Sequence, residues 1–179
     1  MNTVNKRDIT IHSPSTGFSL ELPNNSHIEV LHAQDAAETQ DHLAVNDLSL
    51  IMKWTIDQTR VLFTGDVGFK VGTLLSTDRR IESEILKMPH HGGIPIPPNA
   101  FYERVDPKYV LVPSPRSVWC GDLAERSRKW VNQKNIPVWI NGVNGHIVVD
   151  FYGNKVIFSP ETVSGECKNK AFGRVEWKY

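Results

Sequence analysis

Carboxylate and imidazole side chains follow two separate apolar segments of the chain. Asp66 comes after the apolar segment 60–64 and a glycine, and the adjacent His90 and His91 come after the largely apolar segment 85–88. Neutral imidazole and carboxylate together suit zinc or manganese. Taken separately, a Thr-Gly-Asp sequence is typical of a turn after a strand, and a histidine pair is typical of a polar loop. Neither feature alone therefore predicts a metal site.

The order of the two features favours a shared metal ion. Each follows an expected buried strand, and a stretch long enough for a short helix separates them. Parallel strands joined by a helix end at the same edge of a sheet, so Asp66 and a histidine could bind one ion. Adjacent histidines on an extended segment point in opposite directions, so one would face the ion and the other solvent or substrate. The residues leave open whether His90 or His91 is the ligand.

Strands and helices alternate along the part of the chain that would position these residues. Alternating polarity or short apolar runs predict strands at 18–22, 27–31, 48–56, 60–64, 109–112 and 137–140. Helical spacing of apolar residues predicts helices at 78–86, with Asp78 as its cap, and at 122–133. A loop is predicted at 33–47 and a closing hairpin at 146–151 and 155–158. This order predicts an α/β or α+β layered domain.

Composition and charge are those of an ordinary globular domain. The 179 residues fit one domain. Because 20 basic residues balance 20 acidic ones, the net charge gives no reason to expect binding to nucleic acid or to an anionic membrane. The chain contains no apolar run of about 18 residues, which predicts no membrane segment. Its first residues are polar, which predicts no secretory signal and a cytoplasmic location. Cys120 and Cys167 lie far apart in sequence, so we expect no disulfide framework, in keeping with a reducing compartment.

Three segments together resemble the metallo-β-lactamase-like domain of ComEC-type competence proteins and their soluble relatives. Residues 46–50, 61–66 and 86–93 are similar to that family's N-x-x-S-L strand, L-x-T-G-D strand end and L-K-x-x-H-H-G segment, in the same order and at about the same spacing. Residues 106–110 and Gly145 also fit. The resemblance covers roughly residues 27 to 150.

The resemblance implies a fold, a metal site and an activity. The family fold is an αββα sandwich of two similar halves with metal ions at one edge, and this chain is similar to the C-terminal half. Asp66 corresponds to the aspartate that bridges two zinc ions, with manganese as the alternative metal. His90, which follows the strand directly, is the favoured match to the last histidine ligand, and His91 would then donate to an oxyanion on the substrate. The implied reaction is hydrolysis of a phosphodiester, for which nucleic acid is a candidate substrate. Arg116, on a loop after a strand, is our candidate for binding a phosphate group.

The chain departs from the family at the motif that supplies most ligands. The motif His-x-His-x-Asp-His is absent, and His12, His27, His32 and His42 do not fit its spacing. A catalytic zinc usually has three protein ligands, whereas this assignment provides two. We therefore expect residues 1–160 to be a partial domain followed by a polar tail at 161–179, with weak metal binding and little turnover alone. The alternatives are a non-catalytic binding or scaffolding module, and one half of a split enzyme. The missing half would leave a sheet face bare, so a homodimer is a further expectation.

Overall fold

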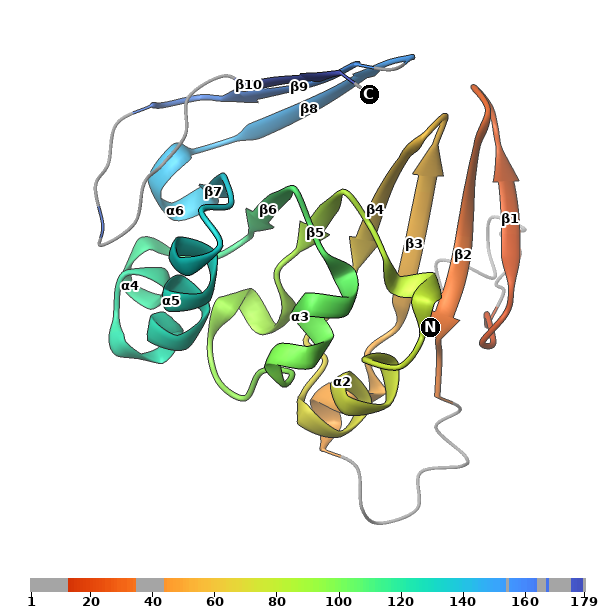
Figure 1. The fold of residues 1–179 in the computed structure, drawn as a ribbon, viewed down its shortest axis with the longest axis horizontal. Helices are drawn as coiled ribbons and strands as arrows, with labels where there is room; N and C mark the ends of the chain where they lie inside the picture. Colours follow the sequence, from red (N-terminus) through yellow and green to blue (C-terminus); the bar gives the residue numbers. More distant parts are fainter. Residues whose placement is uncertain (1–12, 35–43, 154, 164–166, 168–174, 179) are drawn as a thin grey trace, which may run out of the picture.

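The computed structural model describes residues 13–34, 44–153, 155–163, 167 and 175–178. Seven strands form one mixed sheet in which spatial order follows chain order (Figure 1). The strands are β1 (Ser19–Leu22), β2 (Ser26–His32), β3 (Ile51–Ile56), β4 (Thr59–Phe63), β5 (Ile85–Lys87), β6 (Tyr109–Val112) and β7 (Val138–Ile140). Strands β1 to β4 pair antiparallel, and β4 to β7 pair parallel. The predicted α/β class is thus confirmed at this level.

Short helices cover one face of this sheet. They are α2 (Phe69–Leu75), α3 (Asn99–Val105), α4 (Arg116–Trp119), α5 (Glu125–Gln133) and α6 (Asn141–Asn144), with 3-10 turns η2 (Val45–Leu48), η3 (Arg79–Ile81), η4 (Pro89–Gly92) and η5 (Asp122–Ala124). Apolar side chains from α2, α3 and α5 pack in one cluster with strand residues such as Leu62 and Leu86, both 0% exposed. Parallel neighbours need a crossover connection, which usually contains a helix, and this accounts for the helices between β4, β5, β6 and β7.

A second, three-stranded sheet covers part of the other face. It consists of β8 (Ile147–Tyr152), β9 (Lys155–Pro160) and β10 (Val175–Lys178), in the order β10-β9-β8. Figure 1 shows it on the opposite side of the molecule from α2 and α3. Trp139 of β7 stacks on Phe158 of β9, with ring centroids 4.2 Å apart, and this pair lies in a second apolar cluster. The predicted hairpin is present, and the segment predicted as a polar tail contributes β10 to the sheet.

The prediction of a helix at 78–86 is wrong. Asp78 caps only the 3-10 turn η3, where its carboxylate accepts from the Arg80 backbone N–H, and residues from Ile85 onward form β5. Leu86 lies in the helix-side cluster and Ile85 in the other, because adjacent strand residues face opposite sides. Both are apolar because β5 is buried on both faces, and this pattern also satisfies helical spacing. The helix of this connection is α2 instead.

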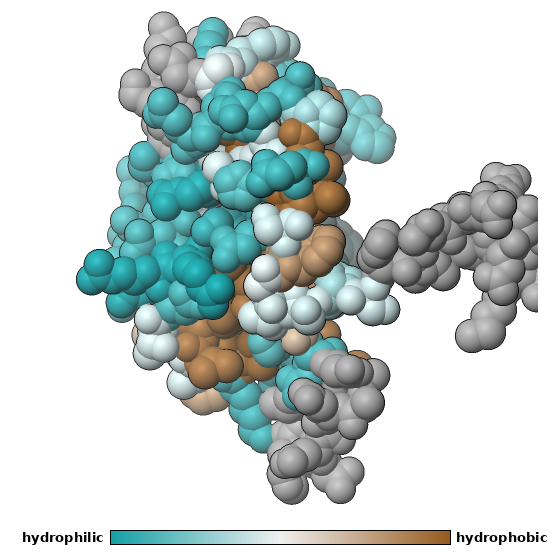
Figure 2. All heavy atoms as spheres, turned by 90° about the vertical axis from the view of Figure 1, so that its right-hand side faces the viewer, coloured by the Kyte–Doolittle hydropathy of each residue, from teal (hydrophilic) through white to brown (hydrophobic). Residues whose placement is uncertain are grey.

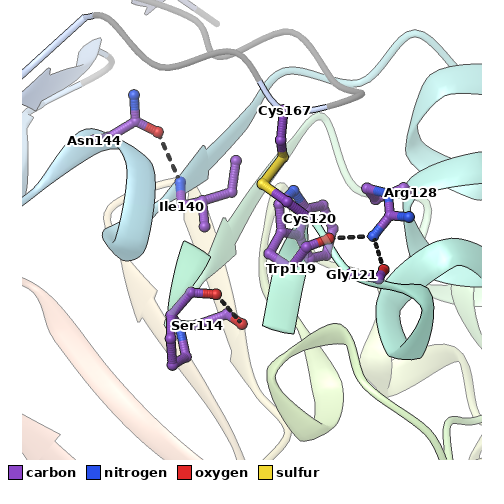
Figure 3. The surroundings of a disulfide bond; sticks show 9 residues. Ser114, Trp119, Cys120, Gly121, Arg128, Ile140, Asn144 and Cys167 are labelled. Atoms are coloured by element: carbon purple, nitrogen blue, oxygen red, sulfur yellow. Dashed lines mark hydrogen bonds between the residues drawn. A yellow bond between two sulfur atoms is a disulfide. The ribbon is translucent and has the colours of Figure 1, made fainter. Parts of the chain in front are cut away.

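The two cysteines form a disulfide, contrary to the prediction from their spacing. Cys120 follows α4 and Cys167 lies in the C-terminal segment, with Cα atoms 5.4 Å apart (Figure 3). Beside it, the buried Arg128 guanidinium donates to the carbonyl oxygens of Trp119 and Gly121. A sequence separation of 47 residues does not limit separation in space, which is why the spacing misled. Disulfide bonds are rare in reducing compartments, so the disulfide does not support the predicted cytoplasmic location, which stays a prediction.

In the described part of the chain, no helix combines the length and apolarity needed to cross a bilayer.

Candidate metal centre

The turn after β4 holds Asp66 in a fixed position. Gly65 has φ +54°, a conformation that favours glycine, and a Cβ there would lie 2.6 Å from the Cβ of Ser49. The Ser49 hydroxyl oxygen accepts from the Asp66 backbone N–H at 2.9 Å. The Thr64 hydroxyl donates to the Lys87 carbonyl at 2.9 Å, which ties the ends of β4 and β5 together. The carboxylate therefore projects from a well-supported turn at the sheet edge.

The histidine pair lies at the same edge, as the parallel-strand argument predicted. The His90 backbone N–H donates to the Gly65 carbonyl at 3.3 Å, directly linking the two segments. Both histidines lie in the left-handed region, with φ 46° for His90 and 55° for His91, rather than in an extended conformation. Such residues are uncommon outside glycine and cluster at functional sites. Their rings still diverge, with centroids 6.5 Å apart.

His91 is the histidine that the structure brings to Asp66. Its Nδ1 lies 2.6 Å from the Pro113 carbonyl oxygen, and its Nε2 lies 3.5 Å from Asp66 Oδ1. A carbonyl only accepts, so Nδ1 carries the proton and the neutral ring presents a lone pair at Nε2. Two acceptors then face each other, an arrangement that a cation between them would stabilise. Two ligands of a tetrahedral zinc ion are separated by roughly 3.4 Å. The pair therefore fits one ion.

His90 is held by other groups. Its Nδ1 lies 3.1 Å from the Pro95 carbonyl oxygen, and its Nε2 lies 3.4 Å from the Asn46 side-chain nitrogen. With Nδ1 donating, the Nε2 lone pair accepts from the Asn46 amide. His90 was the expected ligand because it directly follows the strand in sequence. The left-handed backbone at both histidines, which periodicity does not report, places His91 rather than His90 beside Asp66.

Lys87 is a third member of the site and was not predicted from the sequence. Its Nζ donates to the Gly65 carbonyl at 2.6 Å and lies 3.5 Å from Asp66 Oδ1. Burial lowers the pKa of Lys87, and the Asp66 carboxylate offsets only part of that effect. Lys87 belongs to the same Leu-Lys-x-x-His-His-Gly segment as the two histidines. This shared segment was the signal in the sequence that could have pointed to Lys87 as a site residue.

Asp47 has a structural partner rather than a place in the metal site. It is 3% exposed, and its Oδ1 accepts from the backbone N–H groups of Gly68 at 3.0 Å and Val71 at 3.4 Å, at the start of α2. A carboxylate at a helix N-terminus satisfies otherwise unpaired N–H groups and the positive end of the helix dipole. Asp47 therefore anchors η2 to the helix that follows the Asp66 turn.

Arg116 lies on the same side of the fold as the site. It is exposed and begins α4, three positions after Pro113, whose carbonyl oxygen meets the His91 ring. Its proposed phosphate-binding role stays a prediction. Of the remaining histidines, His27 and His32 lie on β2, the exposed His146 directly precedes β8, and His12 and His42 lie outside the described residues.

Within the described residues, no group of three or more His, Cys, Asp or Glu side chains is arranged to hold a metal ion. A comparison of the sequence with protein-family models and with curated proteins finds no match. The geometry therefore provides two potential ligands, Asp66 and His91, with Lys87 on the same carboxylate.

Proposed function

We propose that this chain belongs to a metal-dependent hydrolase of metallo-β-lactamase type that acts on a phosphodiester, with Asp66 and His91 as two ligands of one divalent ion. The observation that carries the proposal is the pair of acceptor atoms, His91 Nε2 and Asp66 Oδ1, that face each other at 3.5 Å. The parallel order of β4 and β5 at this edge and the resemblance of the three motif segments add support.

The protein's own groups prepare these ligands. The Pro113 carbonyl fixes the His91 tautomer and ring orientation, as outer partners of metal-binding histidines commonly do. Ser49 and Thr64 hold the turn that presents Asp66. When bound, zinc or manganese would supply Lewis acidity and an activated water for hydrolysis. Arg116, with its planar guanidinium, would bind non-bridging phosphate oxygens of the substrate.

Further ligands must come from groups other than these two. A catalytic zinc typically takes three protein ligands, so we propose that another segment or a second polypeptide completes the site. An apolar strip supports this idea: Leu20, Ile28, Met52, Trp54 and Phe63 share the sheet face that also carries the second apolar cluster. Leu20 is 45% and Phe63 37% exposed, and Figure 2 shows hydrophobic surface on the side that carries β1. A second copy of the chain is the simplest occupant to test, by its oligomeric state in solution.

A non-catalytic binding module is the second candidate. The observation that favours it is the ion pair of Lys87 with Asp66, because an ammonium group already neutralises the carboxylate without any metal. Metal binding distinguishes the two functions, since the module predicts none.

The test is a calorimetric titration of the purified chain with Zn²⁺ and Mn²⁺, together with hydrolysis of bis(p-nitrophenyl) phosphate. We expect weak but saturable binding and slow turnover, both lost in Asp66→Asn. Asp57→Asn is the matched control, because Asp57 lies in the β3–β4 turn at φ 52°, a conformation that asparagine tolerates. Absence of saturable binding, or equal binding by Asp66→Asn, would contradict the proposal.

A further inference from the structure

One oxygen atom of Asp66 meets two different cationic or cation-binding groups. Oδ1 lies 3.5 Å from Lys87 Nζ and 3.5 Å from His91 Nε2. The Lys87 side chain is 17% exposed, and its ammonium also donates to the Gly65 carbonyl at 2.6 Å. The ammonium therefore stands beside the oxygen that faces the candidate ligand nitrogen.

The position of Lys87 follows from the strand. Lys87 pairs with Leu111 in the β5–β6 register and so points to the face that carries the second apolar cluster, in which Leu111 packs. A lysine on such a face needs acceptors for its buried ammonium. The Gly65 carbonyl and the Asp66 carboxylate, both in the turn after the neighbouring strand, are those acceptors.

We infer that Lys87 is the internal counter-ion of Asp66, which holds the carboxylate toward His91 without metal and opposes the binding of a divalent ion at the same oxygen. The inference rests on the proposed metal site and adds a control of its affinity. A positive charge 3.5 Å from a ligand oxygen repels a divalent cation strongly at a partly buried site. Binding therefore exchanges one cation for another, and the ammonium has to withdraw from Oδ1. Lys87 acts through Asp66 and is a positioning residue.

The test compares Zn²⁺ affinity by calorimetry in the wild-type chain, Lys87→Met and Lys87→Arg. We expect Lys87→Met to bind Zn²⁺ at least about tenfold more tightly, because the opposing charge is gone. Lys87→Arg keeps the charge and should bind as weakly as the wild type, an outcome that a merely structural role does not predict. Lys129→Met, which removes an exposed charge on α5, is the matched control and should change nothing.

Two further variants separate the possible failures. Lys87→Gln removes the charge but keeps N–H donors for the Gly65 carbonyl, so it replaces Lys87→Met if the methionine variant does not fold. The double variant Lys87→Met with Asp66→Asn should lose the gained affinity. Suppose that Lys87→Met and Lys87→Gln bind Zn²⁺ no more tightly than the wild type, and that binding still depends on Asp66. This result would overturn the role of Lys87 and leave the metal site intact. Binding that never depends on Asp66 in any variant would overturn the proposed site itself and the Lys87 inference with it.

Discussion

At the scale of single residues, hydrogen bonds to backbone carbonyls determine what each candidate group can do. The Pro113 carbonyl fixes the proton on His91 Nδ1, and the Pro95 carbonyl does the same for His90. His91 Nε2 then faces a carboxylate, whereas His90 Nε2 meets the Asn46 amide. Two chemically identical neighbours thus acquire different roles through their second nitrogen.

Glu84 provides a residue-scale prediction about pH. Its carboxylate accepts two hydrogen bonds from the Arg60 guanidinium, at 2.7 and 3.0 Å, and one from the Arg60 backbone N–H at 3.0 Å. Burial acts to raise the pKa of Glu84, but the Arg60 contacts outweigh it and hold the pKa below its ordinary value of 4.5. The folded state therefore binds a proton less readily than the unfolded state, and this contribution to stability is present above pH 4.5.

We expect Glu84→Gln to lower the free energy of unfolding at pH 7 by about 1–3 kcal/mol, because it removes the charged acceptor of a pair in which Glu84 is buried and Arg60 is partly exposed. The difference from the wild type should shrink as the pH falls below 4.5 through the lowered pKa of the folded state. Urea unfolding at several pH values measures both effects. Glu103→Gln, at an exposed position of α3, is the control. A difference independent of pH would show that the charge of Glu84 is not responsible.

Some of the site could be predicted from residue types, and some could not. Asp66 and the histidine pair were predictable because glycine and apolar runs mark the strand ends that carry them. The choice of His91 was not, since it depends on left-handed backbone at both histidines. Lys87 was overlooked because a lysine in a strand usually points to solvent, and only the pairing of β5 with β6 shows which face it occupies.

At the scale of elements, long or regular segments were predictable and short helices were not. Strands β2, β3, β4 and β6 and the β8–β9 hairpin lie within a few residues of their predicted ranges, because apolar runs between turn residues specify them. The predicted helix at 122–133 begins as the turn η5 and continues as α5. Helices α4 and α6 have four residues each, too few for a helical period to be visible in sequence.

The disulfide gives a prediction at the element scale, because it links the C-terminal segment to the end of α4. It closes a loop with a sequence separation of 47, which restricts the unfolded chain. We expect reduction with dithiothreitol to lower the free energy of unfolding by about 2–4 kcal/mol. Denaturant unfolding with and without reductant measures the change, and Cys120→Ser, which already lacks the bond, should not respond. Two titratable thiols in the native, unreduced protein would contradict the expectation.

At the scale of the whole molecule, two apolar clusters on opposite faces of one mixed sheet organise the fold. The helix layer fills one face, and β8 to β10 cover only part of the other, since the strip from Leu20 to Phe63 stays partly exposed. The layered α/β class could be predicted from element order, but the extent of cover could not, because it depends on the path of the C-terminal segment. The candidate metal centre lies where β4 and β5 end, and the exposed strip is where another segment would reach this sheet face.

The most direct measurement is Zn²⁺ affinity in the matched pair His91→Gln and His90→Gln, by calorimetric titration of folded protein. The two variants remove the same ring from adjacent positions, and glutamine keeps similar bulk. Loss of saturable binding in His91→Gln and its retention in His90→Gln is the predicted result, because only His91 Nε2 faces Asp66. Loss in His90→Gln with retention in His91→Gln would contradict the account.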